Sequence, residues 1–131
     1  IGQKKDIEDQ YIYEIFDMIR FDEEKQGVPA AFLSYPDQRL LEMGIALASS
    51  PKLLLLDEPL AGISAESIND VKRTIRIISE HTNIAIIDHN LDAVTDLADI
   101  ITVMHHGEVI FEGSPEELSM NEHVQKIYLK G

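Results

Sequence analysis

The first third of the chain shows the apolar spacing of amphipathic helices. Apolar residues recur every three or four positions near the N-terminus, which predicts a helix there. A break around Gly27 follows, and a second helix is predicted from Ser34 through Leu47. Ser34 and Asp37 have the spacing of a capping box in which Asp replaces the usual Glu. The apolar positions of the first helix are Ile7, Tyr11, Ile15, Met18 and Ile19.

Two short, wholly apolar runs follow, at residues 53–56 and 84–87. Bounded runs of this kind are typical of strands that are buried on both faces of a parallel sheet. A helix is predicted between them, because apolar residues there return on one helical face. Strand, helix and strand in this order predict an α/β architecture with a parallel sheet. The residues of the helical face are Ile68, Val71, Ile75 and Ile78.

The pattern of apolar and turn residues in the last third of the chain predicts shorter helices and strands. A short helix is expected from Asn90, and residues 100–103 and 109–111 read as paired strands around a turn at His106 and Gly107. A second capping box is expected at residues 114–117, with proline at the first helical position. The residues expected to face the interior in the helices of this third are Leu91, Val94, Leu97, Val124, Ile127 and Tyr128.

Composition narrows the function classes. Of the 131 residues, 44% are apolar and 27% charged, which is typical of a folded domain. The formal net charge of -13 argues against binding to a nucleic-acid backbone. There is no cysteine, so disulfides and thiolate-bound metals are excluded. No signal-peptide pattern is present, and a first residue Ile1 in place of Met leads us to expect a piece of a longer protein.

Ionisable residues follow both apolar runs. Asp57 and Glu58 come directly after the first run, and Asp88 and His89 after the second. Ligands of parallel sheets gather at the carboxyl ends of the strands. The stretch "LLLLDEP" also has the form of a Walker B element, in which one carboxylate holds Mg²⁺ through water and the next acts on the attacking water. A strand that simply ends in a polar loop is the alternative interpretation.

Four stretches together resemble the ATP-binding-cassette (ABC) ATPases of transporters. They are, in order, "LSYPDQRLLEMG", "LLLLDEPLAGIS", "IAIIDHN" and "HHGEVIFEGSPEEL". They are similar to the signature motif, Walker B with the D-loop, the switch-histidine strand and the terminal hairpin with its helix. Within the family the chain is similar to branched-chain amino-acid transporter ATPases, and also to lipopolysaccharide-export ATPases through "IIDHN" and "NEHVQKIYL".

The resemblance implies a partial ABC-type P-loop NTPase fold in two parts. Residues 1–50 would be part of the helical subdomain that ends in the signature helix, and residues 51–131 the C-terminal part of the ATPase core. It also implies roles for single residues: Glu58 as general base, His89 as a γ-phosphate contact, and Asp57 as the Mg²⁺ residue. The implied nucleotide contacts are Ser34, Tyr35, Pro36, Asp37, Gln38 and Asp57, and the implied D-loop at the dimer interface is Ala61, Gly62, Ile63 and Ser64.

The signature stretch departs from the family pattern at Pro36, where the family usually has a glycine whose N–H points at the γ-phosphate. Proline removes that donor but is accepted in the first turn of a helix. The stretch is therefore both a helix start and an altered signature motif. Loss of one charge-assisted hydrogen bond would weaken the nucleotide sandwich by about 1.5–3 kcal/mol. A second departure is Ile45, where the family commonly has arginine.

None of the seven glycines forms the G-x-x-x-x-G-K-[ST] phosphate loop, so the 131 residues resemble the C-terminal half of a cassette. We therefore expect that this chain alone does not hydrolyse ATP, and that ATP and Mg²⁺ bind only with the missing half or a partner. We also expect the incomplete sheet to leave an apolar surface that needs a cover.

The implied partners are a second ATPase subunit in a head-to-tail dimer, the missing N-terminal half and membrane permease subunits, with no nucleic acid. The implied location is cytoplasmic, peripheral on the inner face of the membrane. Two alternatives remain open: a degenerate cassette part that binds partners without turnover, and a lobe of a chromosome-maintenance or DNA-repair ATPase. The "DHN" histidine and the terminal hairpin favour transport, and amino-acid import is the expected process.

Overall fold

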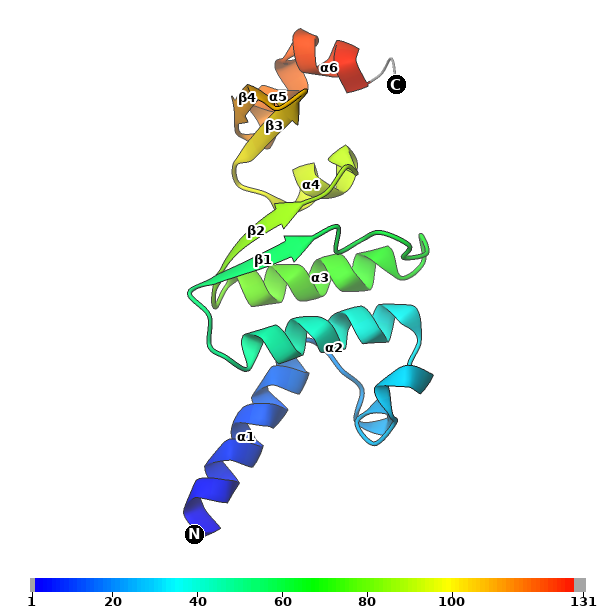
Figure 1. The fold of residues 1–131 in the computed structure, drawn as a ribbon, viewed down its shortest axis with the longest axis vertical. Coiled ribbons are helices and arrows are strands. Elements are labelled where there is room, and N and C mark those ends of the chain that lie inside the picture. Colours follow the sequence, from blue (N-terminus) through cyan, green and yellow to red (C-terminus); the bar gives the residue numbers. More distant parts are fainter. Residues whose placement is uncertain (1, 129–131) are drawn as a thin grey trace. The chain divides into compact units, whose positions relative to one another are not determined.

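The structure is a computed structural model that describes the backbone of residues 2–128 and the surroundings of the side chains from 10 to 127. Helices and strands follow the predicted order along the chain (Figure 1). Their contacts divide the chain into two compact units, Ile1–Asp88 and His89–Gly131, and each is described by itself. The assignment of residues 1–50 and 51–131 to two parts of a cassette stays a prediction.

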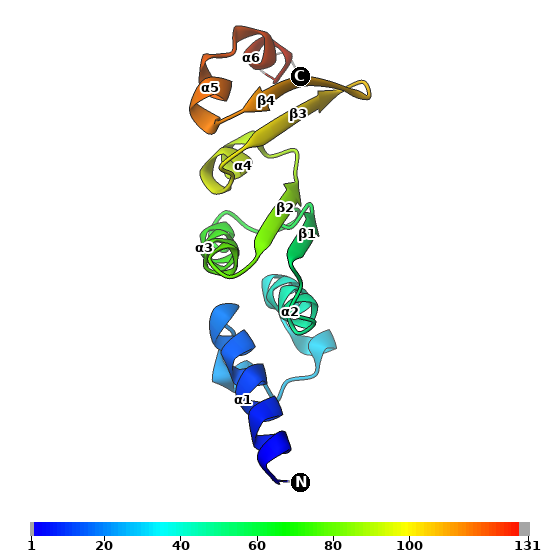
Figure 2. The ribbon, with the colours of Figure 1, turned by 90° about the vertical axis from the view of Figure 1, so that its left-hand side faces the viewer.

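The first unit combines three helices with two parallel strands. The helices α1, α2 and α3 contact one another, and β1 pairs with β2 from Leu53 opposite Asn83 to Asp57 opposite Ile87. Helix α3 connects the two strands and lies along one face of the pair (Figure 2). The elements are α1 (Gly2–Met18), 3-10 turns at Glu23–Lys25 and Ala30–Phe32, α2 (Tyr35–Leu47), β1 (Leu53–Asp57), α3 (Ile68–Ser79) and β2 (Asn83–Ile87).

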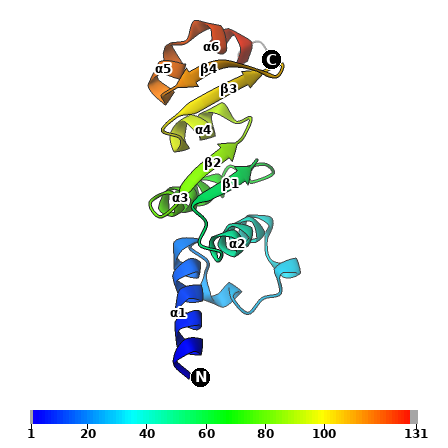
Figure 3. The same ribbon diagram turned by 60° about the vertical axis from the view of Figure 1, so that its left-hand side comes forward.

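Close helix packing explains a small residue within α2 (Figure 3). A Cβ atom at Gly44 would lie 2.8 Å from Cδ1 of Ile19, which follows α1, so a larger residue there would require the Ile19 side chain to move. Ile15 and Ile19 are buried, as the helical spacing predicted. Tyr11, also on α1, donates its hydroxyl to the Leu47 carbonyl oxygen at 3.2 Å, and thereby ties α1 to the end of α2.

Only one face of the pair β1–β2 is covered by other residues of the described structure. Leu54 is buried, whereas Leu53 is 53% and Leu55 71% exposed, and Ile87 of β2 is 70% exposed. The prediction of strands buried on both faces is therefore wrong for these residues, because two strands and one crossover helix cover a single face. Successive side chains of a strand point to opposite faces, so the three exposed residues lie on the open one. The expected uncovered apolar surface is present.

The second unit is built on the predicted hairpin. Its two antiparallel strands join through His106 and Gly107, whose φ values of 49° and 82° both lie in the left-handed region required by a type I′ turn. Its core holds Ile101, Val103, Leu118 and Val124. The elements are α4 (Leu91–Leu97), β3 (Ile101–His105), β4 (Glu108–Gly113), α5 (Pro115–Met120) and α6 (Glu122–Tyr128).

The predicted capping box of α5 is confirmed. The Ser114 hydroxyl oxygen accepts from the Glu117 N–H at 3.2 Å, and the Glu117 carboxylate accepts from the Ser114 N–H at 2.8 Å. In the part of the chain that the structure describes, no helix combines the length and the apolar character needed to cross a bilayer.

Candidate functional site: the end of β1 and the start of α2

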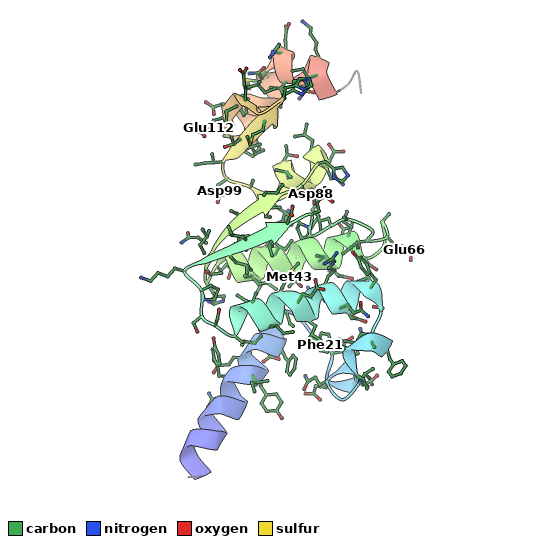
Figure 4. All side chains as sticks on the ribbon, viewed as in Figure 1. Phe21, Met43, Glu66, Asp88, Asp99 and Glu112 are labelled. Atoms are coloured by element: carbon green, nitrogen blue, oxygen red, sulfur yellow. The ribbon has the colours of Figure 1, made fainter. Side chains whose placement is uncertain are left out.

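Two carboxylates stand at the carboxyl end of the parallel strand pair. Asp57 is the last residue of β1, opposite Ile87 of β2. The Glu58 N–H donates to the Ile87 carbonyl oxygen at 2.7 Å, so the hydrogen-bond ladder continues one residue past the strand. Asp57 and Glu58 are both exposed, and Asp88, labelled in Figure 4, follows β2 at the same end. The structure thus brings the predicted Walker B residues to the edge where parallel sheets bind their ligands.

The backbone at Glu58 is unusual. Its φ of 44° is in the left-handed region, which few residues other than glycine adopt. Pro59 follows and disfavours the right-handed helical conformation at Glu58. Pro59 and Leu60 are buried, and the Ala61 N–H donates to the Glu58 carbonyl oxygen at 3.1 Å. Packing and hydrogen bonds therefore hold a strained conformation at the carboxylate, and such conformations cluster at functional sites.

The predicted D-loop and the signature stretch touch each other. Gly62 has a φ of 72°, and a Cβ atom there would lie 3.3 Å from the ring of Tyr35. The Tyr35 hydroxyl accepts two hydrogen bonds from the Arg39 guanidinium, at 3.0 and 2.6 Å. Arg39 also donates to the Glu42 carboxylate at 2.7 Å. The tyrosine ring is thus fixed from α2 while its edge packs on the loop that follows β1.

The signature helix begins at Ser34, as predicted. The Ser34 hydroxyl oxygen accepts from the Asp37 N–H at 3.3 Å. The same hydroxyl donates to Asp37 Oδ2 at 2.6 Å, and Lys25 Nζ donates to Asp37 Oδ1 at 2.9 Å. Lys25 also pairs with Asp22 at 2.9 Å. The Asp37 carboxylate therefore takes its hydrogen bonds from two side chains rather than from the backbone N–H that a capping box uses.

These contacts change the pKa of the Asp37 carboxyl. Partial burial raises the pKa of the carboxyl, but the hydrogen bonds from Ser34 and Lys25 outweigh it and leave the pKa below its ordinary value. Asp22 and Asp37 in turn raise the pKa of Lys25. The start of α2 accordingly carries a carboxylate and an ammonium in contact at neutral pH.

Two further signature residues have structural contacts. Pro36 occupies the first turn of α2 and has no N–H to donate. The Gln38 side-chain amide donates to the carbonyl oxygens of Ala30, at 3.0 Å, and Leu33, at 3.2 Å. Gln38 therefore fixes the turn that leads into α2.

His89 begins the second unit, where it is exposed. It precedes α4, whose N-cap Asn90 accepts from the Ala93 N–H at 3.1 Å. The histidine thus follows a parallel strand and precedes a capped helix, as the sequence predicted. Its role at a phosphate stays a prediction.

A shallow depression of about 190 Å³ lies between α2 and β1. Pockets that enclose small-molecule ligands usually measure about 300–1,000 Å³. This depression is therefore too small to enclose a nucleotide, and its lining mixes apolar side chains with three charged ones. Its lining residues are Arg39, Glu42, Met43, Ala46, Leu54, Leu55, Leu56, Asp57 and Pro59.

The residues at the end of β1 fit Mg²⁺ bound together with a nucleotide. Mg²⁺ prefers oxygen ligands and usually takes one or two carboxylates, water and substrate phosphates. Asp57 is an exposed carboxylate in a suitable position. Among the described residues no group of three or more His, Cys, Asp or Glu could hold a metal, so these residues do not form a full cage there. Asp57 would hold, through water, an ion bound chiefly by phosphates.

Sequence reasoning missed the partners of the signature residues. Lys25 lies twelve residues before Asp37, in a segment whose spacing gave no signal. The contact of Tyr35 with Gly62 joins two motifs that the chain separates by a strand and two loops. The identity of Gly62 was a partial signal, because glycine is expected where φ is positive.

Curated relatives match most of this chain. It is 35% identical over 102 residues to a probable ABC transporter ATP-binding protein of Azorhizobium caulinodans, which covers 77% of this chain and 36% of the relative. It is 36% identical over 98 residues to the lipopolysaccharide export system ATP-binding protein LptB of Escherichia coli K12, covering 74% and 41%. It is 35% identical over 102 residues to the branched-chain amino-acid transport ATP-binding protein BraF of Pseudomonas aeruginosa, covering 76% and 40%.

Solved structures agree with these relatives. The ADP conformation of the ATP-binding cassette MJ1267 has a TM-score of 0.79 and 26% identity, over 93% of this chain and 50% of that one. CbiO1 of Clostridium perfringens, part of the ABC transporter complex CbiONQ, has a TM-score of 0.79 and 25% identity, over 92% and 49%. No protein-family model matches the chain.

The chain spans about two fifths of the length of these relatives and about half of the solved cassettes. The curated relatives match about three quarters of this chain, and the solved cassette MJ1267 covers 93% of it. The chain belongs to the ATP-binding proteins of ABC transporters, as a part of their ATPase cassette.

Proposed function

We propose that the chain supplies the Walker B carboxylates, the D-loop and the signature helix of an ABC transporter ATPase that hydrolyses ATP to drive membrane transport. The observation that carries the proposal is the position of Asp57 and Glu58 at the carboxyl end of β1, with Glu58 held in a left-handed turn. An exposed carboxylate at such a position can accept a proton from water. The family name of the relatives supports ATP as the nucleotide.

In this proposal each residue keeps the role that the resemblance gave it. Asp57 is the residue that would hold Mg²⁺, which lowers the charge of the phosphates when bound. Glu58 orients and deprotonates the attacking water, and His89 contacts the γ-phosphate. Residues 61–64 pass the second ATPase subunit of a head-to-tail dimer. Asp57, Glu58 and His89, which act on the nucleotide in this proposal, are all exposed.

The missing half of the cassette is the proposed cover for the open face of the strand pair. That face exposes Leu53, Leu55 and Ile87, and it continues into the depression between α2 and β1. Burial of three such side chains would stabilise the assembly by several kcal/mol, at about 1.5–3 kcal/mol each. The relatives are more than twice as long as the matched segment, so they have the residues to supply this cover.

Within the family we propose amino-acid import as the transport process, at the inner face of the membrane and with permease subunits as partners. The relative BraF is named for branched-chain amino-acid transport, and it shares 35% identity. Lipopolysaccharide export, for which LptB is named, is the alternative, at 36% identity. Stimulation of hydrolysis by the permease of one system and not the other would decide between them.

The test is complementation. The chain is fused behind the P-loop half of E. coli LptB, and Mg²⁺-dependent ATP hydrolysis is measured. We expect the fusion to hydrolyse ATP and the 131 residues alone not to do so. Glu58→Gln should lower the rate at least about 100-fold, since a general base typically contributes that much or more.

Glu66→Gln is the matched control, because Glu66 is an exposed glutamate in the loop before α3 and has no proposed catalytic role. It should hydrolyse ATP like the unmodified fusion. A folded fusion with no activity, or equal rates for Glu58→Gln and Glu66→Gln, would contradict the proposed function.

A further inference from the structure

The loop that follows β1 consists of two consecutive turns. The Ala61 N–H donates to the Glu58 carbonyl oxygen at 3.1 Å, and the Ile63 N–H donates to the Leu60 carbonyl oxygen at 3.3 Å. Gly62 lies inside the second turn and has a φ of 72°. Because the two turns overlap, a shift of the backbone at Gly62 changes the path of the chain back to Glu58.

Burial holds only the first part of this loop. Pro59 and Leu60 are buried, whereas Gly62 is exposed. The ring of Tyr35, from the start of α2, packs against Gly62, where an added Cβ atom would lie 3.3 Å from Tyr35 Cε1 and 3.8 Å from the Tyr35 hydroxyl oxygen. The ring therefore fills the space beside the Gly62 backbone and limits the movement of the second turn toward α2.

Arg39 fixes the position of this ring. Its Nε and Nη2 atoms donate to the Tyr35 hydroxyl oxygen at 3.0 and 2.6 Å, and its guanidinium carbon lies 4.9 Å from the centre of the ring. The two residues are four positions apart in α2, where side chains lie on the same helical face. Glu42 accepts a further hydrogen bond from Arg39 at 2.7 Å. Although Tyr35 is 43% exposed, its ring is thus held from one helical turn further along α2.

The side chains that hold the ring also lie beside the carboxyl end of β1. Arg39 and Glu42 line the same depression as Asp57 and Pro59. Glu58, between Asp57 and Pro59, has a left-handed backbone, and such a conformation persists only when the surrounding structure fixes it. Burial of the next two residues supports this backbone from one end of the loop, and the ring contact supports it from the other.

We propose that Tyr35 is a positioning residue of the ATPase reaction: its ring, held by Arg39, braces the loop after β1 and so fixes the backbone that carries Glu58. The catalytic consequence rests on the proposed function. Tyr35 acts on the general base through the loop and does not contact the nucleotide, in contrast to the role that the resemblance implies for it. The two roles change different kinetic constants, because loss of a nucleotide contact raises KM whereas displacement of the base lowers kcat.

The first test needs no nucleotide and uses the 131-residue chain. The exchange of the Ala61 and Ile63 amide protons with water is measured by NMR, together with the chemical shifts of the Gly62 Hα protons. Tyr35→Ala should remove the ring-current shift at Gly62 and raise both exchange rates about tenfold, the change that loss of a typical packing contact produces. Unchanged exchange in a folded Tyr35→Ala variant would overturn the inference.

Two variants separate the ring from its hydroxyl and from a general loss of stability. Tyr35→Phe keeps the ring and should retain most of the Gly62 shift and the slow exchange. Tyr13→Ala is the matched control, because Tyr13 is a tyrosine on α1 that is 59% exposed, and its loss should leave the loop unchanged. Equal exchange rates at Ala61 and Ile63 in Tyr13→Ala and Tyr35→Ala would show an effect of stability alone, and the inference would be wrong. Tyr35→Leu replaces Tyr35→Ala if the alanine variant does not fold.

Arg39→Met tests the hold on the ring. It should raise the exchange of the loop amides less than Tyr35→Ala does, because the ring remains but loses two hydrogen bonds and the charge beside it. In the Tyr35→Ala variant, the further change Arg39→Met should add nothing at the loop, since the two residues act through one contact. An added effect of equal size in the double variant would contradict the action of Arg39 through the ring.

The second test measures ATP hydrolysis by the LptB fusion. Tyr35→Ala should lower kcat about tenfold and leave the KM for ATP unchanged, because a displaced base mainly affects the transition state. Tyr35→Phe should restore most of the lost kcat, and Tyr13→Ala should match the unmodified fusion. A raised KM with unchanged kcat would indicate a nucleotide contact and overturn the inference. An inactive unmodified fusion would contradict the proposed function, whereas the exchange measurements decide the role of Tyr35 at the loop without it.

Discussion

The helices α2 and α5 begin with nearly the same chemistry and end up with different hydrogen bonds. Each has a serine N-cap, a proline in the first turn and an acidic residue three positions after the serine. In α5 the Glu117 carboxylate returns to the Ser114 N–H. In α2 the Asp37 carboxylate takes the Ser34 hydroxyl proton and the Lys25 ammonium.

One methylene group accounts for much of this difference. Glutamate at the third helical position is long enough to reach back to the N-cap N–H, and this closes a capping box. Aspartate is shorter and meets the nearer serine hydroxyl. The start of α5 is therefore capped by bonds between its own side chains and backbone N–H groups, while the start of α2 is tied by Lys25 to a segment twelve residues earlier.

The removal of each serine hydroxyl has the largest expected effect. Ser34→Ala and Ser114→Ala each lose an N-cap, which costs about 1–2 kcal/mol of unfolding free energy. Ser34→Ala should cost more, because Asp37 also loses a hydrogen-bond donor, whereas Glu117 keeps the Ser114 N–H. Urea unfolding of the chain, followed at NMR signals of each unit, measures both. A larger loss of unfolding free energy for Ser114→Ala would show that the Ser34–Asp37 bond does not add to the cap.

The exchange of the two acids has a smaller expected effect. Glu117→Asp should shorten the side chain out of reach of the Ser114 N–H and cost about 0.5–1 kcal/mol. Asp37→Glu should gain a bond to the Ser34 N–H and lose contact with Lys25, with a net change below about 0.5 kcal/mol. Unfolding by urea measures the free energies, and the Ser34 amide shift reports the new bond. Equal losses for the two exchanges would show that side-chain length is not the cause.

The pH dependence of Asp37 is the smallest expected effect. Its pKa in the folded chain is lowered, so the ionised form is favoured by folding and stabilises the chain above the unfolded pKa of about 3.9. That stabilisation is lost as the pH falls through the lower folded value. From pH 5 to pH 3 the unmodified chain should therefore lose more unfolding free energy than Asp37→Asn does. Parallel losses in the two proteins would argue against the contribution of these hydrogen bonds.

The sequence was sufficient to predict most of the helices and strands and the capping box of α5, but not the bonds of Asp37 at the start of α2. Apolar spacing predicted α1, α2, α3 and both strand pairs, because local periodicity and cap chemistry decide them. The sequence was not sufficient to predict which strand residues are exposed, or which residues far apart in the chain are in contact. Leu53 and Leu55 look like core residues in a run of four leucines, yet they are exposed because burial depends on what covers the sheet. Lys25 and Asp37 meet through a turn whose path no local pattern encodes.

The central claim is that the turn after β1 is where this chain meets the metal end of a nucleotide. Paramagnetic broadening by Mn²⁺ with ATP, in the fusion with the LptB P-loop half, tests it directly. We expect the amides of Asp57 and Glu58 to broaden strongly when both Mn²⁺ and ATP are added, and Asp57→Asn to weaken the effect. Sharp signals at Asp57 and Glu58 in the presence of saturating Mn²⁺ and ATP would contradict it.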